Sequence, residues 1–268
     1  MCRSSLTKHM VVGATASLLV GARFAPATQT KVGSPMTASV PASSERADPD
    51  SVTAKRSAVV SGKVKAAVAA LAGLVRPLSH PHALEDAFQS YFAFKAKHGE
   101  EIRRPLLYFA DYGLPSSTPR GYVFDMDRLR IVDGPFTVAH GRGSAESKDG
   151  IPRRFSNTSG SAATSLGLYL TQDLYRFRGQ TIGGSYSAVG LRLEGVSTGY
   201  NDNARARRVV AHGAPYVTPR GAGRSEGCPA MELSRARRLL PKLANGAMVF
   251  LFAPDSAWME HDPWIAAE

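Results

Sequence analysis

The sequence predicts a mainly β fold of the α+β class, in which a short helical segment precedes one strand-rich domain. Apolar residues recur at helical spacing ahead of Pro105. After Pro105, short runs with β-branched or aromatic residues are separated by Gly, Pro and Asp turns. The strand-rich stretch contains about 150 residues, which is enough for one domain with a sizeable core.

The helical segment is expected over residues 61–103 and contains two amphipathic patterns. Both patterns follow the i, i+3, i+4 spacing of one helix face, and Pro77 ends the first. The apolar positions are Val64, Ala67, Val68, Leu71, Leu74 and Val75, then Leu84, Ala87, Phe88, Tyr91 and Phe92. Two helices are therefore expected ahead of the main domain.

The main domain is expected over residues 104–258. Its candidate strands are short and hydrophobic, and several show the alternation of a half-buried strand. They cover residues 106–110, 121–124, 129–132, 136–140, 166–170, 189–193, 208–212 and 247–252.

One further helix is predicted between the last two of these strands, with an apolar face at residues 239–243. Ser234 is the expected N-cap, and Gly246 is expected to follow the end of the helix. Pro241 indicates a kink or a late start. Residues 259–268 are expected to form a C-terminal tail.

The N-terminus has the pattern of a cleaved export signal over residues 1–27. A basic start is followed by an apolar run, Met10–Val20, and by a cleavage motif at Ala25–Ala27. The apolar run is short for a membrane span, and no later stretch is expected to cross a bilayer, so no stable membrane anchor is predicted. Residues 28–60 are rich in Ser, Thr, Ala and Pro and are expected to form a flexible linker.

The chain carries a formal net charge of +11, and loss of the leader would leave it basic. Such a protein is attracted to anionic surfaces. Its arginine pairs are scattered and lack an aromatic-interleaved or zinc-finger pattern, which argues against a nucleic-acid partner. The sequence has no H-E-x-x-H, C-x-x-C or phosphate-loop motif, so neither a metal nor a cofactor is expected.

Cys228 is the only cysteine outside the predicted leader, and it lies in the glycine-rich segment Gly223–Pro229. His212 lies upstream, at the start of the turn His212-Gly213-Ala214. A thiolate nucleophile needs a neighbouring imidazole or another cation to lower the pKa of the thiol. The amides of Gly227 and Cys228 are candidates for an oxyanion hole.

Two other interpretations of this segment stay open from the residues alone. Gly223–Gly227 matches G-x-S-x-G, which makes Ser225 a rival nucleophile. A serine elbow needs a strand before it and a helix directly after, whereas Pro229 follows here. Alternatively, Cys228 is a buried structural cysteine, because free cysteine is among the most buried residue types.

A series of ordered motifs runs from about residue 105 to 256. They are Val138–Ser144, Phe155–Asn157, Gly160-Ser161, Ser165–Gly167, Leu193–Gly195, Tyr200–Ala204, His212–Ala214 and Gly223–Ala230. These motifs resemble the L,D-transpeptidases (YkuD-type) of bacterial cell walls, and most closely their second, divergent branch.

The resemblance implies a YkuD-like mixed β-sandwich or barrel. It also implies that Cys228 attacks a peptidoglycan stem peptide between its third residue and the following D-alanine. An acyl-enzyme thioester forms, His212 moves the proton, and the backbone at Gly227 and Cys228 stabilises the oxyanion. An amine of a second stem then completes a cross-link in the periplasm or cell wall.

The same site would act as an L,D-carboxypeptidase or endopeptidase if water replaced that amine. A noncatalytic wall-binding module is the alternative from another class. The oligomeric state is not indicated by the sequence.

One departure from the family pattern concerns the thiol. The commoner branch has histidine directly before the glycine and cysteine, whereas this chain has Glu226, whose charge opposes thiolate formation. Arg224 is expected to offset it. Ser225, Gly213 and His140 are predicted to support the site, His140 by lining the groove or positioning the turn.

The motif Asn201-Asp202-Asn203 and Tyr216 carry groups that can hydrogen-bond a peptide stem. Asn-Asp-Asn is equally a turn sequence. These residues are therefore left outside the predicted catalytic set.

Overall fold

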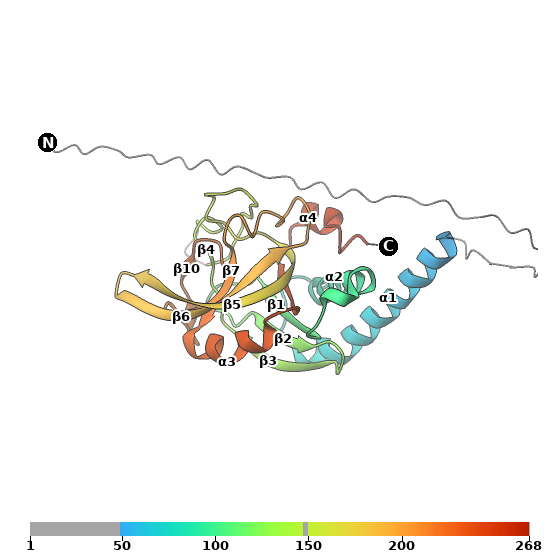
Figure 1. Cartoon of the computed structure of the whole chain (residues 1–268), viewed down its shortest axis with the longest axis horizontal. Coiled ribbons are helices and arrows are strands. Elements are labelled where there is room, and N and C mark those ends of the chain that lie inside the picture. The colour runs from blue at the N-terminus through green and yellow to red at the C-terminus, as the bar shows by residue number, and fades with distance from the viewer. Residues whose placement is uncertain (1–48, 147–149, 268) are drawn as a thin grey trace, which may run out of the picture. The chain divides into compact units, whose positions relative to one another are not determined.

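The computed structural model describes residues 49–146 and 150–267 (Figure 1). The predicted export signal, and the predicted linker up to residue 48, lie outside the described residues.

The central feature of the fold is a mixed eight-stranded sheet, which confirms the predicted mainly β class. Its strand order is β11-β7-β6-β5-β12-β1-β2-β3, with parallel pairing only between β1 and β12 and between β7 and β11. The strands are β1 (Leu106–Asp111), β2 (Gly121–Asp125), β3 (Arg130–Phe136), β5 (Gly167–Thr181), β6 (Gly184–Gly195), β7 (Val210–Ala214), β11 (Ala230–Glu232) and β12 (Met248–Phe252).

Two small sheets stand beside the large one. β4 (His140–Gly141) pairs in parallel with β10 (Arg224–Ser225), and β8 (Val217–Thr218) pairs with β9 (Gly221–Ala222). Strands β5 and β6 continue past the sheet as a long hairpin, seen at the left of Figure 1.

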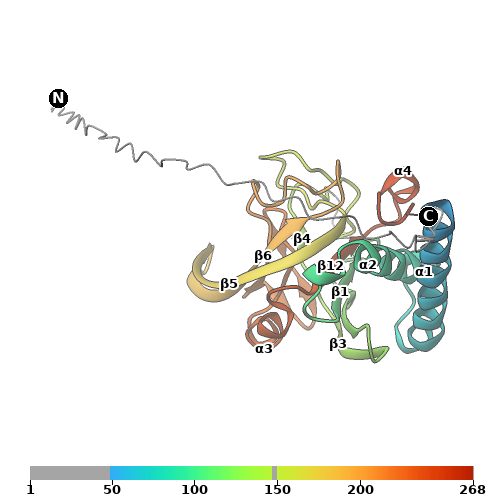
Figure 2. The same ribbon diagram turned by 45° about the vertical axis from the view of Figure 1, so that its right-hand side comes forward.

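Four helices accompany the sheet in the described part of the chain. They are α1 (Pro49–Leu71), α2 (Ala83–Lys97), α3 (Leu233–Leu243) and α4 (Ser256–His261), with single 3₁₀ turns η1 (Ala72–Leu74) and η2 (Gly99–Glu101). Helices α1 and α2 pack against each other, and α2 contacts β12, β1 and β5 (Figure 2). Helix α3 packs against β7 and β6.

Helix α1 begins at Pro49, inside the stretch predicted to be linker, rather than near residue 61. Proline is tolerated in the first turn of a helix, where its missing N–H is not needed. The predicted start was late because the apolar residues that pack α1 onto the domain begin only at Val60. They continue at Val64, Ala67 and Leu71, so tertiary packing stabilises a helix whose first turns carry little apolar signal.

By length and composition alone, Thr53–Leu74 is long and apolar enough to cross a membrane. This corrects the expectation that no stretch beyond the leader has that property. The buried face of α1 packs on α2 in the same hydrophobic core as the sheet, so the helix is part of the domain.

Helix α3 differs from the prediction at its start. It begins at Leu233 with Glu232 as the N-cap residue, and no side chain caps it. Ser234 therefore lies inside the first turn and is not the cap. Pro241 is accommodated within the helix, and Gly246 follows its end at φ +101°, where a Cβ would lie 2.7 Å from Glu101 O.

The C-terminal residues belong to the packed domain. Trp258 of α4 is buried against Phe250 and Phe252. Trp264 stacks edge-on against Phe94 and donates from Nε1 to Val196 O at 2.6 Å. The predicted tail thus ties β6 to α2.

Candidate active site

The segment that carries Cys228 is a tight turn between β10 and β11. Gly227 has φ +119°, and a Cβ there would lie 2.8 Å from Ala163 O, so the residue before the thiol must be glycine. Ser225 holds the turn from inside: its Oγ donates to Cys228 O at 2.7 Å and accepts from Gly227 N at 3.2 Å. A strand follows at Ala230, not the helix that a serine elbow requires.

The parallel pairing of β11 with β7 brings together the segments that carry Cys228 and His212. Ala230 is level with His212 in the register, and the His212 amide donates to Pro229 O at 3.2 Å. The Cys228 sulfur accepts from Val210 N at 3.4 Å and lies 3.9 Å from Arg208 O. The two residues singled out in the sequence therefore lie on neighbouring segments, Cys228 just before β11 and His212 on β7.

His212 is buried, with 7% of its surface exposed, and its Nδ1 lies 3.1 Å from Gly213 O. A carbonyl can only accept, so Nδ1 carries the proton and Nε2 keeps its lone pair. Burial lowers the pKa of His212, and the bond to Gly213 O opposes this shift. The imidazole is thus neutral at pH 7 and able to accept a proton. The Phe177 ring stands edge-on to it, with ring centroids 5.6 Å apart.

Gly213 fixes which face of β7 carries the imidazole. A Cβ at Gly213 would lie 2.8 Å from the Cβ of Ala236, so this position faces α3. Because side chains alternate along a strand, His212 faces away from α3. Gly213 supports the site by close packing on the helix behind it.

Opposing effects act on the Cys228 thiol. The net result is a raised pKa: burial raises it most, the Val210 N–H and the charge of Arg207 lower it, and the charge of Glu226 raises it. Cys228 as a residue is half-buried. Formation of the thiolate therefore depends on groups that counter the effect of burial.

Arg224 does not offset Glu226 as the sequence predicted. Glu226 pairs instead with Arg142, with Nε and Oε1 2.7 Å apart, and Arg224 donates to Ala145 O at 3.2 Å. The reason is the β4–β10 pairing: the Arg142 amide donates to Ser225 O at 2.7 Å, which brings Arg142 level with Glu226.

Arg207 is the residue near the thiol that sequence reasoning missed. It belongs to one of the scattered arginine pairs, within the run Arg205–Arg208, yet its side chain is half-buried and makes four hydrogen bonds. Its place between the Tyr200–Ala204 motif and the His212 strand was the available signal, but the sequence does not say which arginine of the run turns inward.

His140 is fully buried and does not line a groove. Its Nδ1 accepts from Arg120 Nη2 at 3.0 Å, and its Nε2 has no hydrogen-bond partner in the described part of the chain. Burial, together with the charges of Arg120 and Arg224, lowers the pKa of His140 to about 3. This neutral imidazole lies on β4, the strand that supports the nucleophile turn, which fits the predicted positioning role rather than substrate contact.

The two predicted oxyanion donors are not equivalent. The Gly227 amide already donates a hydrogen bond to Ser225 Oγ. The Cys228 amide has no acceptor among the described residues. Of the pair, the Cys228 amide is the one free to stabilise a developing oxyanion.

Asn201 and Asn203 serve the local fold. Asn201 is buried, accepts from Ser197 N and donates to Leu168 O, both at 2.9 Å. Asn203 is held by Asn157 through its backbone amide. The turn interpretation of Asn-Asp-Asn is therefore correct.

Three partly exposed tyrosines have pKa values that respond to the thiol. Tyr175 comes from β5, Tyr186 from β6 and Tyr216 from the turn after β7. Burial chiefly raises their pKa values, and the negative charge of Cys228 raises all three further.

A cavity of about 930 Å³ lies along the β5–β6 hairpin and reaches α3 at Arg237 and Pro241. Its lining includes Tyr175 and Phe177, and the Phe177 ring stands edge-on to His212. The cavity therefore adjoins the ring that contacts the imidazole.

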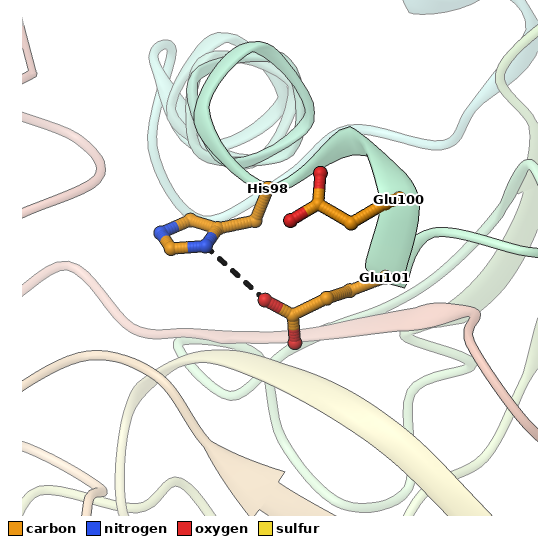
Figure 3. Close-up of side chains that lie close together, drawn as sticks. All are labelled: His98, Glu100 and Glu101. Carbon is orange, nitrogen blue, oxygen red and sulfur yellow. Dashed lines mark ion pairs between the residues drawn. The ribbon is translucent and has the colours of Figure 1, made fainter. Parts of the chain in front are cut away.

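One group of possible metal ligands occurs after α2: His98, Glu100 and Glu101 (Figure 3). His98 Nδ1 pairs with Glu101 Oε1 at 3.1 Å, and its ring stacks on Phe94. Both carboxylates are exposed. None of the three contacts Cys228 or His212 in the hydrogen bonds described above, so this group is separate from the candidate active site.

Comparison with known proteins decides the family. The family model of the L,D-transpeptidase catalytic domain matches residues 77–252. The chain belongs to this family. The match spans the predicted motifs and both Cys228 and His212, and it supports a transpeptidase-like function at the cell wall.

Solved L,D-transpeptidases are similar at low identity. The L,D-transpeptidase LdtMt1 in complex with imipenem is 13% identical over 55% of this chain and 59% of its own, with a TM-score of 0.36. The enzyme from Mycobacterium smegmatis is 12% identical over 56% and 59%, with a TM-score of 0.34. The enzyme from Stackebrandtia nassauensis is 13% identical over 63% and 66%, with a TM-score of 0.33. The chain thus spans less than two thirds of these structures, and no curated protein matches it.

Proposed function

We propose that this protein is an exported cysteine acyltransferase that cross-links peptidoglycan stem peptides. The observation that carries the proposal is the pairing of β11 with β7, which places half-buried Cys228 on the segment beside the strand that carries the buried, neutral imidazole of His212. The resemblance to L,D-transpeptidases supplies the substrate class. No cofactor enters the proposed reaction.

In the first half-reaction, His212 Nε2 accepts the thiol proton and the Cys228 sulfur attacks the carbonyl carbon of the third stem residue. The Cys228 amide donates to the resulting oxyanion. The bond to the D-alanine nitrogen then breaks, and His212 returns the proton to that nitrogen. D-Alanine leaves, and a thioester remains on Cys228.

In the second half-reaction, the side-chain amine of another stem attacks the thioester carbonyl. His212 takes a proton from the attacking nitrogen, the carbon–sulfur bond breaks, and the thiol is regenerated. Tyr175, Tyr186 and Tyr216 are proposed to hold the stem backbone beside the thiol, since aromatic rings with a hydroxyl offer both contact area and hydrogen bonds.

The test follows products made from purified tetrapeptide muropeptides. Wild-type protein is expected to release D-alanine and to form a dimer whose mass equals two stems minus one D-alanine. Cys228→Ala is expected to form neither product. The Asn203→Ala variant serves as the control for handling and purity, because Asn203 belongs to a turn and has no role in the proposed reaction. Release of D-alanine by Cys228→Ala would overturn the mechanism, and hydrolysed tripeptide without dimer, even with added stem amine, would make the enzyme a carboxypeptidase.

Export is the second part of the proposal. Residues 1–27 are proposed to be removed and the mature protein to act in the bacterial periplasm or cell wall, where its positive charge favours anionic polymers. N-terminal sequencing of protein recovered from the envelope of an expressing bacterium is expected to begin after Ala27. Recovery of an uncleaved chain from the cytoplasm would contradict it.

A further inference from the structure

Arg207 is bound more completely than a surface arginine. One terminal nitrogen, Nη1, donates to Ser156 O at 2.6 Å and to Ser165 Oγ at 2.7 Å. The other, Nη2, donates to Ala163 O at 2.7 Å and to Ser161 Oγ at 3.2 Å. The guanidinium therefore has one fixed position, since four hydrogen bonds in two directions leave the planar group little freedom.

None of these four acceptors is a carboxylate, and no ion pair of Arg207 occurs within residues 49–146 and 150–267. Other arginines of the domain differ in this respect: Arg142 pairs with Glu226, and Arg192 pairs with Asp173. The positive charge of Arg207 is thus not neutralised by its own contacts. A half-buried charge without a counter-ion acts strongly on its surroundings.

The guanidinium lies beneath the turn that carries the thiol. A Cβ built on Gly227 would be 3.5 Å from Arg207 Nη2 and 2.8 Å from Ala163 O, the oxygen that Nη2 holds. Gly227 directly precedes Cys228. One face of Arg207 therefore meets the nucleophile turn, while its hydrogen bonds fix the segment 161–165 against which that turn rests.

The neighbouring charges leave Arg207 as the effective cation. Glu226, the other charge near the thiol, opposes thiolate formation and is bound to Arg142. His212 is kept neutral by burial. Arg224 is turned to Ala145 O.

We propose that Arg207 is a positioning residue whose uncompensated guanidinium stabilises the Cys228 thiolate and holds the loop under the nucleophile turn. The inference rests on the proposed role of Cys228 as nucleophile. In a histidine–cysteine pair the positive charge that stabilises the thiolate normally comes from the imidazolium. Here that charge is assigned to Arg207.

The experiment measures the rate of Cys228 alkylation by iodoacetamide between pH 5 and pH 10 on the purified chain. The sulfur displaces iodide only as thiolate, so the midpoint of the rate profile reports the ionisation of this thiol. Trypsin releases the peptide from Ser225 to Arg235, and its mass separates Cys228 from Cys2. No muropeptide is needed, so the result is independent of whether the chain cross-links stems.

The variants separate charge from hydrogen bonding. Arg207→Gln is expected to move the midpoint to higher pH and to slow alkylation at pH 7 about tenfold, as for loss of one nearby opposite charge. Arg207→Lys keeps the charge and is expected to restore most of the rate. Arg205→Gln removes an equal charge from an exposed side chain of the same run and is expected to leave the profile unchanged.

An unchanged midpoint in Arg207→Gln would overturn the inference, as would a Lys variant no faster than the Gln variant. Should Arg207→Gln fail to fold, as judged by circular dichroism, Arg207→Met takes its place, because its unbranched chain keeps the packing of the arginine stem. The expected profile is the same. Absence of an acyl adduct on muropeptides would sink the proposed function and leave this result standing.

Discussion

Replacing Gly227 with alanine tests how the backbone builds the site. The positive φ of +119° costs an alanine about 1–3 kcal/mol, because L side chains rarely adopt it. Its Cβ would also lie 2.8 Å from Ala163 O, a backbone atom that cannot move aside without disturbing its bond from Arg207. Overpacking of this kind adds about 1–3 kcal/mol.

The expected total is a loss of about 2–6 kcal/mol, or a fall in Tm of about 4–24 °C for a domain of this size. Alkylation of Cys228 should slow as well, because the turn is displaced. Gly184→Ala is the matched control: Gly184 has φ +111°, but a Cβ there meets nothing within 4 Å. It isolates the cost of the backbone angle.

The assay is urea unfolding followed by circular dichroism, with the alkylation rate measured on the folded protein. The reasoning would be refuted if Gly227→Ala lost no more stability than Gly184→Ala and alkylated at the wild-type rate.

Two further predictions concern charge. The pKa of His140 is about 3 in the folded chain and about 6.5 in the unfolded chain, so between these pH values only the unfolded chain binds the proton. The free energy of unfolding should therefore fall as the pH drops from about 6.5 towards 3. Near the middle of this window the contribution of His140 approaches about 1.4 kcal/mol per pH unit. Urea unfolding at several pH values should give His140→Gln a flatter slope, and equal slopes would contradict the burial of a neutral imidazole. Glu226→Gln removes a charge that raises the pKa of Cys228, so alkylation at pH 7 should be about twofold faster, a small effect because the carboxylate is exposed. Glu146→Gln, an exposed carboxylate paired with Arg154, should leave the rate unchanged, and a slower Glu226→Gln would reverse the assigned sign.

Local pattern was sufficient for most of the fold. Alternation predicted the first residues of β5 and the second half of β6, but not the hairpin over residues 171–188, and helical spacing predicted α2 and the C-terminal half of α1. The first turns of α1 were missed because that part of the sequence carries little apolar signal, and Ser234 was assigned as the N-cap although the N-cap of α3 is Glu232, two residues earlier. Helix boundaries depend on tertiary packing that local composition does not contain.

The site divides in the same way. Cys228 and His212 were predicted from the sequence because glycine turns and motif order mark them. The partners of the charged groups could not be predicted, because ion pairs form between residues far apart in the chain. The β4–β10 pairing, for example, places Arg142 beside Glu226, which therefore pairs with Arg142 and not with its near neighbour Arg224. Arg207 turns inward to a loop more than forty residues earlier, which no spacing rule predicts.

The central claim, acyl transfer through Cys228, is tested most directly by the mass of the intact protein after a short incubation with a tetrapeptide stem. The account predicts one added tripeptide acyl group, located by peptide mapping on Cys228 in the Ser225–Arg235 peptide, and no addition in Cys228→Ala. An acyl group found on Ser225, or on any residue of the Cys228→Ala protein, would contradict it.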